Sequence, residues 1–144
     1  SINTSILNRF VKLEVQDHRE IMETRVLLET SALQSYFSSD RMEDLRSLSN
    51  TLRRMEKAIA ASEHDAFQVL DLEFHHQIVQ LAGNEVLSQT YEFIKDPFIR
   101  QSQELCAPQD HAQLQEEHRQ LLSGIRRKDV GMIQVLADHL ACHD

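Results

Sequence analysis

Asp71 and His75 stand four residues apart in the stretch "DLEFHH" (71–76), which lies in a segment with the apolar periodicity of an α-helix. Residues i and i+4 lie on the same helix face with Cβ atoms about 6 Å apart, so both side chains can contact one bound object. A carboxylate at the edge of an apolar stripe is costly to bury unless it is paired, hydrogen-bonded or bound to a cation. Taken alone, this pair predicts either a local Asp–His hydrogen bond at a helix surface or part of a metal site.

Two further histidines lie on apolar faces in the last third of the chain. His118 stands at helical spacing with Leu114 and Ile125, and His139 shares a face with Leu136. Neutral imidazole nitrogens and a carboxylate oxygen are ligands that Zn²⁺, Ni²⁺, Co²⁺ and Mn²⁺ accept. We therefore predict a divalent transition metal site, with Zn²⁺ first and Ni²⁺, Co²⁺ or Mn²⁺ as alternatives, either closed and tetrahedral or with positions open to a bound molecule. The predicted ligands are Asp71, His75, His118 and His139.

The spacing of the other histidines does not place them with this inward set. His76 directly follows His75 and so points about 100° away around the helix. His143 lies one turn after His139 and could replace it as a ligand. We expect side chains that face solvent at His18, His64, His76, His111 and His143.

Arg25 is another polar residue on an inward row, because it lies at helical spacing between Ile21 and Leu28. A buried guanidinium needs a partner, since it stays charged at any biological pH and its planar fork suits a carboxylate. The partner is either a neighbouring side chain such as Glu29 or a carboxylate-bearing ligand next to the metal.

The elements that must position these residues are all helices. Helical periodicity continues almost from end to end, and the chain has only three Gly and two Pro and lacks bounded β-branched runs. We predict an all-α fold, a single antiparallel bundle of six to seven helices forming one domain, residues 1–144. The predicted helices cover about 2–15, 17–37, 40–62, 65–83, 85 to the "CAPQD" break, 110–127, and Asp129 to the end.

Several helix boundaries carry recognisable signals. Asp40 and Asp65 are each followed three residues later by Glu or Gln, which is capping-box spacing. Gly83 and Asn84 suit a left-handed C-terminal cap. Pro97 is expected to kink the fifth helix.

Charge and hydropathy exclude some functions. The 15 Lys and Arg against 23 Asp and Glu give a net charge of −8, so the chain is a poor candidate for holding nucleic acid by itself. No apolar run approaches the roughly 20 residues that span a bilayer, so no membrane association is expected. Cys106 and Cys142 lack CxxC spacing and are expected to be reduced thiols in a cytoplasmic protein.

Four motifs, in order, are similar to those of the FCD effector domain, the C-terminal ligand-binding and dimerisation domain of FadR-type GntR transcriptional regulators. "ETRVLLE" (23–29) resembles its E-x-R-x-x-L-E signature, and "DLEFHHQIVQLAGNEVL" (71–87) its D-x-x-F-H and small-Gly-Asn turn. "EEHRQLLSGIRRKDV" (116–130) and "ADHL" (137–140) resemble its E-H stretch and closing H-L. The resemblance extends over about residues 20–140.

The resemblance implies a set of roles. In the metal-containing branch of the family, the matching positions are metal ligands, here Asp71, His75, His118 and His139. The Arg of the first motif can face an organic-acid effector, which assigns Arg25 to the effector site, and Asn84 of the Gly-Asn turn is grouped with it. Family members form homodimers and read operator DNA through an N-terminal winged helix-turn-helix, which nothing in this chain resembles. Lys128 replaces the usual Gly before Asp129, and the chain stops soon after His139, where the family's last helix usually continues.

The sequence thus favours the effector-sensing domain of a bacterial transcriptional regulator, without catalysis, that binds a metal ion and a small organic carboxylate. A metal-dependent hydrolase or lyase is the alternative from another class, but it would need a general base near the metal, and no HExxH element occurs. A third possibility is a dimerisation module in which the metal only stabilises the fold.

Overall fold

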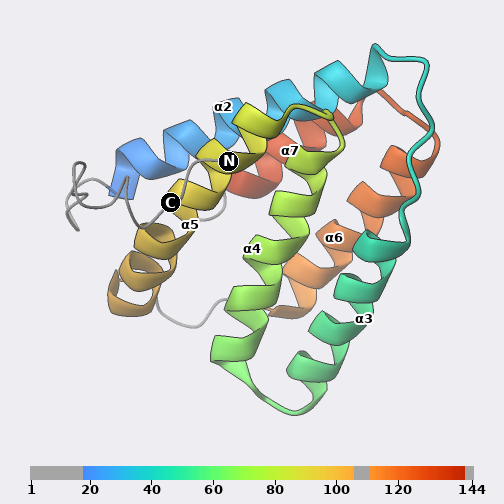
Figure 1. The fold of residues 1–144 in the computed structure, drawn as a ribbon. Coiled ribbons are helices and arrows are strands. Elements are labelled where there is room, and N and C mark those ends of the chain that lie inside the picture. Colours follow the sequence, from blue (N-terminus) through green and yellow to red (C-terminus); the bar gives the residue numbers. More distant parts are fainter. Residues whose placement is uncertain (1–17, 106–110, 142–144) are drawn as a thin grey trace.

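A computed structural model describes residues 18–105 and 111–141 of the chain, with backbone only for residues 100–105. The regular elements in this part are helices (Figure 1). The all-α prediction is confirmed, with six helices in the described residues. They are α2 (His18–Phe37), α3 (Arg46–Ala60), α4 (His64–Gln80), α5 (Glu85–Leu105), α6 (His111–Arg126) and α7 (Met132–Ala141). The helix predicted at 2–15, both cysteines and His143 lie outside the described residues.

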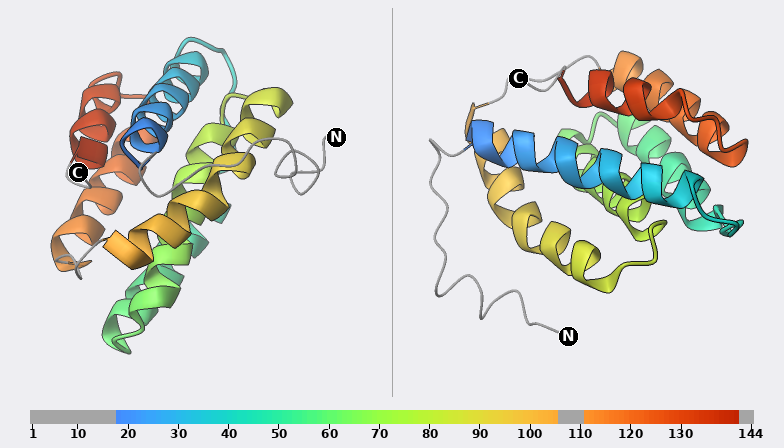
Figure 2. Two further views of the ribbon diagram at one scale, coloured as in Figure 1. Left: turned by 90° about the vertical axis from the view of Figure 1, so that its left-hand side faces the viewer. Right: turned by 90° about the horizontal axis from the view of Figure 1, so that it is seen from above.

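Helix α4 occupies the centre of the bundle. It packs against α2, α3 and α5, while α6 packs against α3 and α7. The first and last described helices, α2 and α7, lie side by side (Figures 1 and 2). Residues from the first and last described helices therefore meet next to α4.

The predicted apolar stripes form the core. Phe67 and Phe74 of α4 and Leu121 and Ile125 of α6 are at most 2% exposed and belong to one hydrophobic cluster. Burying side chains of this kind stabilises a fold by about 1.5–3 kcal/mol each. Since His118 lies in the same stripe as Leu121 and Ile125, their burial carries its imidazole into the interior as well.

The start of α3 differs from the prediction. The helix begins at Arg46, and the capping box expected at Asp40 does not form. Instead, the backbone amide of Glu43 donates a hydrogen bond to the Tyr36 hydroxyl at 3.0 Å, and Asp44 Oδ1 accepts one from the Arg46 amide at 2.9 Å. These contacts hold the segment before α3 in a non-helical turn against α2.

Of the predictions for the two ends of α4, one is wrong and one is confirmed. The predicted cap at Asp65 is wrong, because α4 follows Glu63 without a side-chain cap and Asp65 lies in the first turn, where a negative charge complements the helix dipole. Gly83, after α4, has a φ of +66°, the left-handed conformation expected for it. Pro97 lies inside α5.

The turn between α6 and α7 holds a residue in an unfavourable backbone region. Lys128, in place of the glycine usual in the family's motif, has a φ of 52°. Its Nζ donates a hydrogen bond to the Ser39 carbonyl at 2.8 Å and lies 4.4 Å from the centre of the Tyr36 ring. Asp129 Oδ1 then accepts a hydrogen bond from the Gly131 amide at 2.9 Å, so Asp129 shapes the turn before α7. The side-chain contacts of Lys128 offset the backbone strain.

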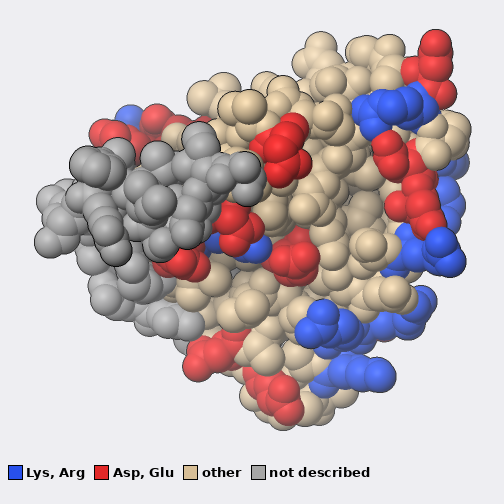
Figure 3. Space-filling view, in the orientation of Figure 1, with Lys and Arg blue, Asp and Glu red and all other residues tan. Residues whose placement is uncertain are grey.

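The surface charge is unevenly distributed. Although the chain has a net charge of −8, Lys and Arg gather over the solvent face of α3 (Figure 3). The α3 side chains concerned are exposed: Arg46, Arg53, Arg54 and Lys57. Among the described residues, no helix is long and apolar enough to cross a membrane.

Candidate metal centre

The four predicted metal ligands meet at one point inside the bundle. Asp71 and His75 come from α4, His118 from α6 and His139 from α7, and one ligand atom of each lies within 4.8 Å of the others. All four side chains are buried, with residue exposures of 6% or less. We call these four residues the His₃Asp site.

The converging atoms are the Nε2 atoms of the imidazoles and one carboxylate oxygen. Asp71 Oδ1 lies 2.8 Å from His118 Nε2 and 3.3 Å from His75 Nε2, and His75 Nε2 lies 3.2 Å from His139 Nε2. Ligands bound 2.0–2.1 Å from a common Zn²⁺ would be roughly 3 Å apart from their neighbours. The observed separations therefore suit a first-row divalent metal ion.

The contact between Asp71 and His118 supports this fit. Although the two atoms are 2.8 Å apart, they are not oriented as a hydrogen bond, and both Asp71 Oδ1 and His118 Nε2 are buried without a hydrogen-bond partner. A buried polar atom without a partner costs about 1–3 kcal/mol. A cation between the two atoms would satisfy both at once.

The second nitrogen of each imidazole has an acceptor that orients the ring. His75 Nδ1 lies 2.5 Å from Glu29 Oε1, and His139 Nδ1 lies 2.6 Å from Glu117 Oε1. His118 Nδ1 lies 3.3 Å from the amide oxygen of Gln115. Such partners place the proton on Nδ1, which leaves the Nε2 lone pair for a metal and raises the basicity of the ligand.

The side-chain amide of Gln115 shows which ring nitrogen of His118 carries the proton. The side-chain nitrogen of Gln115 donates a hydrogen bond to the Leu52 carbonyl at 3.1 Å, so its oxygen must be the atom that faces His118. An amide oxygen only accepts, and Nδ1 of His118 is therefore the protonated nitrogen.

The pKa values of the site show how charge is distributed without an ion. Burial alone would lower the pKa of His75, but the negative charges of Glu29 and Asp71 raise it to about 9. Burial and the charge of His75 lower the pKa of His139 to about 3, and burial also lowers that of His118. The pKa of Asp71 is held well below its usual range by His75 and His118, against the effect of burial. His75 is therefore the imidazole of the site that carries a positive charge at neutral pH.

Arg25 of α2 adjoins the same site. Its guanidinium is fully buried and lies 4.5 Å from the centre of the Phe98 ring. Its Nε donates hydrogen bonds to Glu29 Oε2 at 3.0 Å and to the Tyr91 hydroxyl at 3.2 Å, so the predicted pairing with Glu29 is present. Nη1 and Nη2 are buried without a hydrogen-bond partner. Burial acts to lower the pKa of Arg25, but the electrostatic effects of Tyr91, Glu29 and, to a smaller extent, Asp71 raise it, so Arg25 is linked electrostatically to the His₃Asp site.

Asn84 lies away from this site. It is exposed, and its Oδ1 accepts a hydrogen bond from the Leu87 amide at 3.0 Å, which makes it the N-cap of α5. The structure therefore gives Asn84 a local role in starting α5, whereas Arg25 and the His₃Asp site share the interior.

The prediction that His76 faces solvent is wrong. The residue is 6% exposed and its ring stacks on Tyr91 with centroids 5.3 Å apart. Its Nε2 lies 3.0 Å from Ser88 Oγ. His76 points toward α5 because α5 covers the face of α4 on which it lies.

His18, His64 and His111 are half-buried, so the expectation of solvent-facing side chains holds for them only in part. The rings of His64 and His111 stack with centroids 4.8 Å apart, and Phe67 covers His111.

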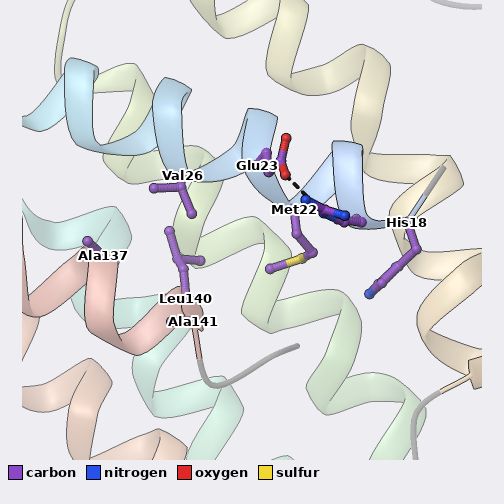
Figure 4. Close-up of a pocket in the computed structure, with 8 residues that line it drawn as sticks. His18, Met22, Glu23, Val26, Ala137, Leu140 and Ala141 are labelled. Carbon is purple, nitrogen blue, oxygen red and sulfur yellow. Dashed lines mark hydrogen bonds and ion pairs between the residues drawn. The ribbon is translucent and has the colours of Figure 1, made fainter.

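A hollow of about 510 Å³ opens at the seam between α2 and α7, outside the His₃Asp site (Figure 4). It is mainly apolar, and Met22 and Val26 of α2 face Leu140 of α7 across it. None of the four His₃Asp residues lines it.

Sequence reasoning missed most of the residues that support the site. Glu29 was considered only as a partner for Arg25, although it also contacts His75. The sequence offers a signal for two of them, because Gln115 lies three residues before His118 and Glu117 lies directly before it. For Tyr91, which donates a hydrogen bond to Glu29 Oε2 at 2.7 Å, the sequence carries no signal.

The structure thus shows an all-helical domain with three histidines and one aspartate in its interior that could hold a metal ion. The sequence pattern of the FCD domain family matches residues 20–141, and the chain belongs to this family. FCD domains are regulatory ligand-binding domains of transcription factors, and the resemblance noted from the four motifs is confirmed. No curated protein matches the chain.

Proposed function

We propose that this chain is the effector-sensing domain of a GntR-type transcriptional regulator that binds a divalent transition metal ion and a small organic carboxylate together. The His₃Asp site would hold the ion, and Arg25 would bind the carboxylate. The proposal rests on buried polar atoms that have no hydrogen-bond partner, both in the His₃Asp site and on Arg25. They are Asp71 Oδ1, His118 Nε2 and both Nη atoms of Arg25.

The donor set supports a transition metal ion. Three imidazoles and one carboxylate match the preference of Zn²⁺, Ni²⁺, Co²⁺ and Mn²⁺. A bound ion with six-fold coordination would keep two positions for oxygen atoms of the effector, and that is the chemistry the metal would supply.

Arg25 supplies the second contact to the effector. Its Nε is already held by Glu29 and Tyr91, so the guanidinium is fixed in orientation before any ligand arrives. The two free Nη atoms can donate parallel hydrogen bonds to one carboxylate, a geometry that Lys cannot reproduce. The stacking of Arg25 on Phe98 favours the same fixed orientation.

The signal would pass through the helices that the site joins. Arg25 lies on α2, and the His₃Asp residues lie on α4, α6 and α7, so effector binding acts on the mutual packing of all four. Couplings between ligand sites are typically about 1–3 kcal/mol, enough to change operator occupancy severalfold. The operator would be bound by a winged helix-turn-helix of the regulator, in a homodimer of the whole protein.

The test is a titration of metal and carboxylates in sequence. The purified protein is analysed for metal by plasma mass spectrometry before and after chelation, and its melting temperature is measured with and without small hydroxy acids, sugar acids, dicarboxylates and amino acids. We expect about one ion per chain and further stabilisation by at least one acid only in the metal-loaded protein. Metal-dependent stability without any response to acids would favour the structural dimerisation module instead. Light scattering of the same sample tests the homodimer.

A further inference from the structure

Glu29 contacts both halves of the proposed site with its two carboxylate oxygens. It is fully buried in α2, and its Oε1 lies 2.5 Å from Nδ1 of His75, whose Nε2 faces the other ligands. Its Oε2 accepts hydrogen bonds from Arg25 Nε at 3.0 Å and from the Tyr91 hydroxyl at 2.7 Å. One carboxylate therefore joins a metal ligand directly to the arginine that would bind the effector.

We propose that Glu29 is the positioning residue that couples metal binding at the His₃Asp site to anion binding at Arg25. The inference rests on the proposed function and adds the route by which the two ligands affect each other's affinity.

The coupling follows from the sharing of one negative charge between the guanidinium of Arg25 and the Nδ1–H group of His75. Glu29 holds the guanidinium of Arg25 on one oxygen and the imidazole of His75 on the other. An anion that binds the two Nη atoms draws part of the positive charge of Arg25 toward itself. Glu29 then acts more strongly on His75 and makes that imidazole a better metal ligand. By thermodynamic linkage, the metal ion must increase the affinity for the anion by the same factor.

The other acceptor carboxylate of the site provides a matched control. Glu117 orients His139 as Glu29 orients His75, with an oxygen-to-Nδ1 distance of 2.6 Å. Its other hydrogen-bond partner is Gln113, one turn away on α6 at 2.9 Å. Glu117 thus supports a metal ligand from a helix that does not carry Arg25.

The experiment measures the affinity of the full chain for Co²⁺, followed by its visible absorption, with and without acetate at constant ionic strength. The ratio of the two dissociation constants is the coupling factor. In the unaltered protein we expect acetate to tighten Co²⁺ binding at least about fivefold. Glu29→Gln and Glu117→Gln should each weaken Co²⁺ binding by about 10–100-fold. Of these two variants, Glu29→Gln alone should reduce the coupling factor. In that variant the direct contact of acetate with the ion is the one remaining source of coupling.

A second variant covers the risk that Glu29→Gln leaves the buried guanidinium uncompensated and prevents folding. Glu29→Asp keeps the charge but is one methylene shorter, so it cannot hold His75 and Arg25 at once, and the coupling factor should fall as well. Equal coupling factors in the Glu29 variants, Glu117→Gln and the unaltered protein would overturn the inference alone. No Co²⁺ binding, or no effect of acetate, in the unaltered protein would overturn the proposed function together with it.

Discussion

Each imidazole of the His₃Asp site is oriented through its Nδ1 atom, which would preorganise the ring to bind a metal ion. Nδ1 faces an acceptor, Glu29, Glu117 or Gln115, and Nε2 faces the common centre. Because these acceptors fix the ring orientation before an ion arrives, little ordering remains to be done on binding. Single substitutions at the ligands should therefore act on metal content more than on the fold.

The first prediction concerns His118. His118→Ala removes the one ligand from α6 and should abolish stoichiometric metal binding, which plasma mass spectrometry measures. His76→Ala is the control, because His76 is a buried histidine on α4 that faces α5. The control should lose stability but keep its metal. A full metal complement in His118→Ala would contradict the assignment of the site.

The second prediction concerns the two Nη donors of the Arg25 guanidinium. Arg25→Lys keeps the positive charge beside Glu29 but removes the paired Nη donors. Carboxylate binding should weaken by about tenfold or more, since one good charge-assisted hydrogen bond is worth about 1.5–3 kcal/mol. Metal content should be unchanged. Isothermal titration with the best acid from the screen compares metal-loaded Arg25→Lys with the metal-loaded unaltered protein, and equal affinity would exclude Arg25 as the anion-binding group.

At the scale of elements, the site depends on four helices that are joined by packing and by polar contacts between them. Helix α4 supplies two of the predicted ligands, and α6 and α7 supply one each, while α2 supplies Arg25 and Glu29. The short turns between α4 and α5 and between α6 and α7 set the directions in which these helices run. Changes in the turns should alter stability without altering the chemistry of the site.

Asn84 provides the test at this scale. Asn84→Ala removes the cap of α5 and should lower the free energy of unfolding by about 1 kcal/mol. Urea unfolding measures this loss. Affinity for metal and carboxylate should stay the same, because the residue is exposed and acts on the local turn. A weaker affinity with unchanged stability would instead return Asn84 to the effector site, as the family's motif had suggested.

For the whole molecule, the buried histidines make stability depend on pH and on metal together. In the metal-free protein the raised pKa of His75 contributes stability that is present below about pH 6.5 and is lost as the pH rises through about 9. The lowered pKa values of His118 and His139 have the opposite effect at acidic pH. They reduce the free energy of unfolding increasingly as the pH falls below about 6.5. The chelated protein should therefore be most stable near neutral pH.

A melting series with and without metal checks this behaviour. Between about pH 6.5 and 9 the chelated protein should lose up to about 3 kcal/mol, because the charged imidazole that Glu29 and Asp71 stabilise is deprotonated. Metal binding removes the same proton, so the stabilisation by added Zn²⁺ should be larger at pH 8.5 than at pH 7. A chelated protein that is as stable at pH 9 as at pH 7 would contradict the raised pKa of His75.

The sequence by itself predicted the class of fold and the four residues that converge in the interior. Apolar residues repeat with helical spacing around Asp71, His75, His118 and His139, and burying those apolar faces forces the polar residues inward with them. The same reasoning placed Arg25 in the interior. Local periodicity is sufficient here, because a residue's position on its own helix decides which way it points.

Only the tertiary structure decided which helices face one another, and with that the supporting contacts. His76 was assigned to solvent because its own helix gave no inward signal, yet α5 covers it. The Asp40 capping box satisfied a local rule, but Tyr36 holds the amide of Glu43 in another arrangement. The contacts of Glu29 with His75 and Tyr91 could not be predicted from spacing, because these partners are 46 and 62 residues away in the chain. Contacts of that kind depend on the packing of whole helices, which no local pattern records.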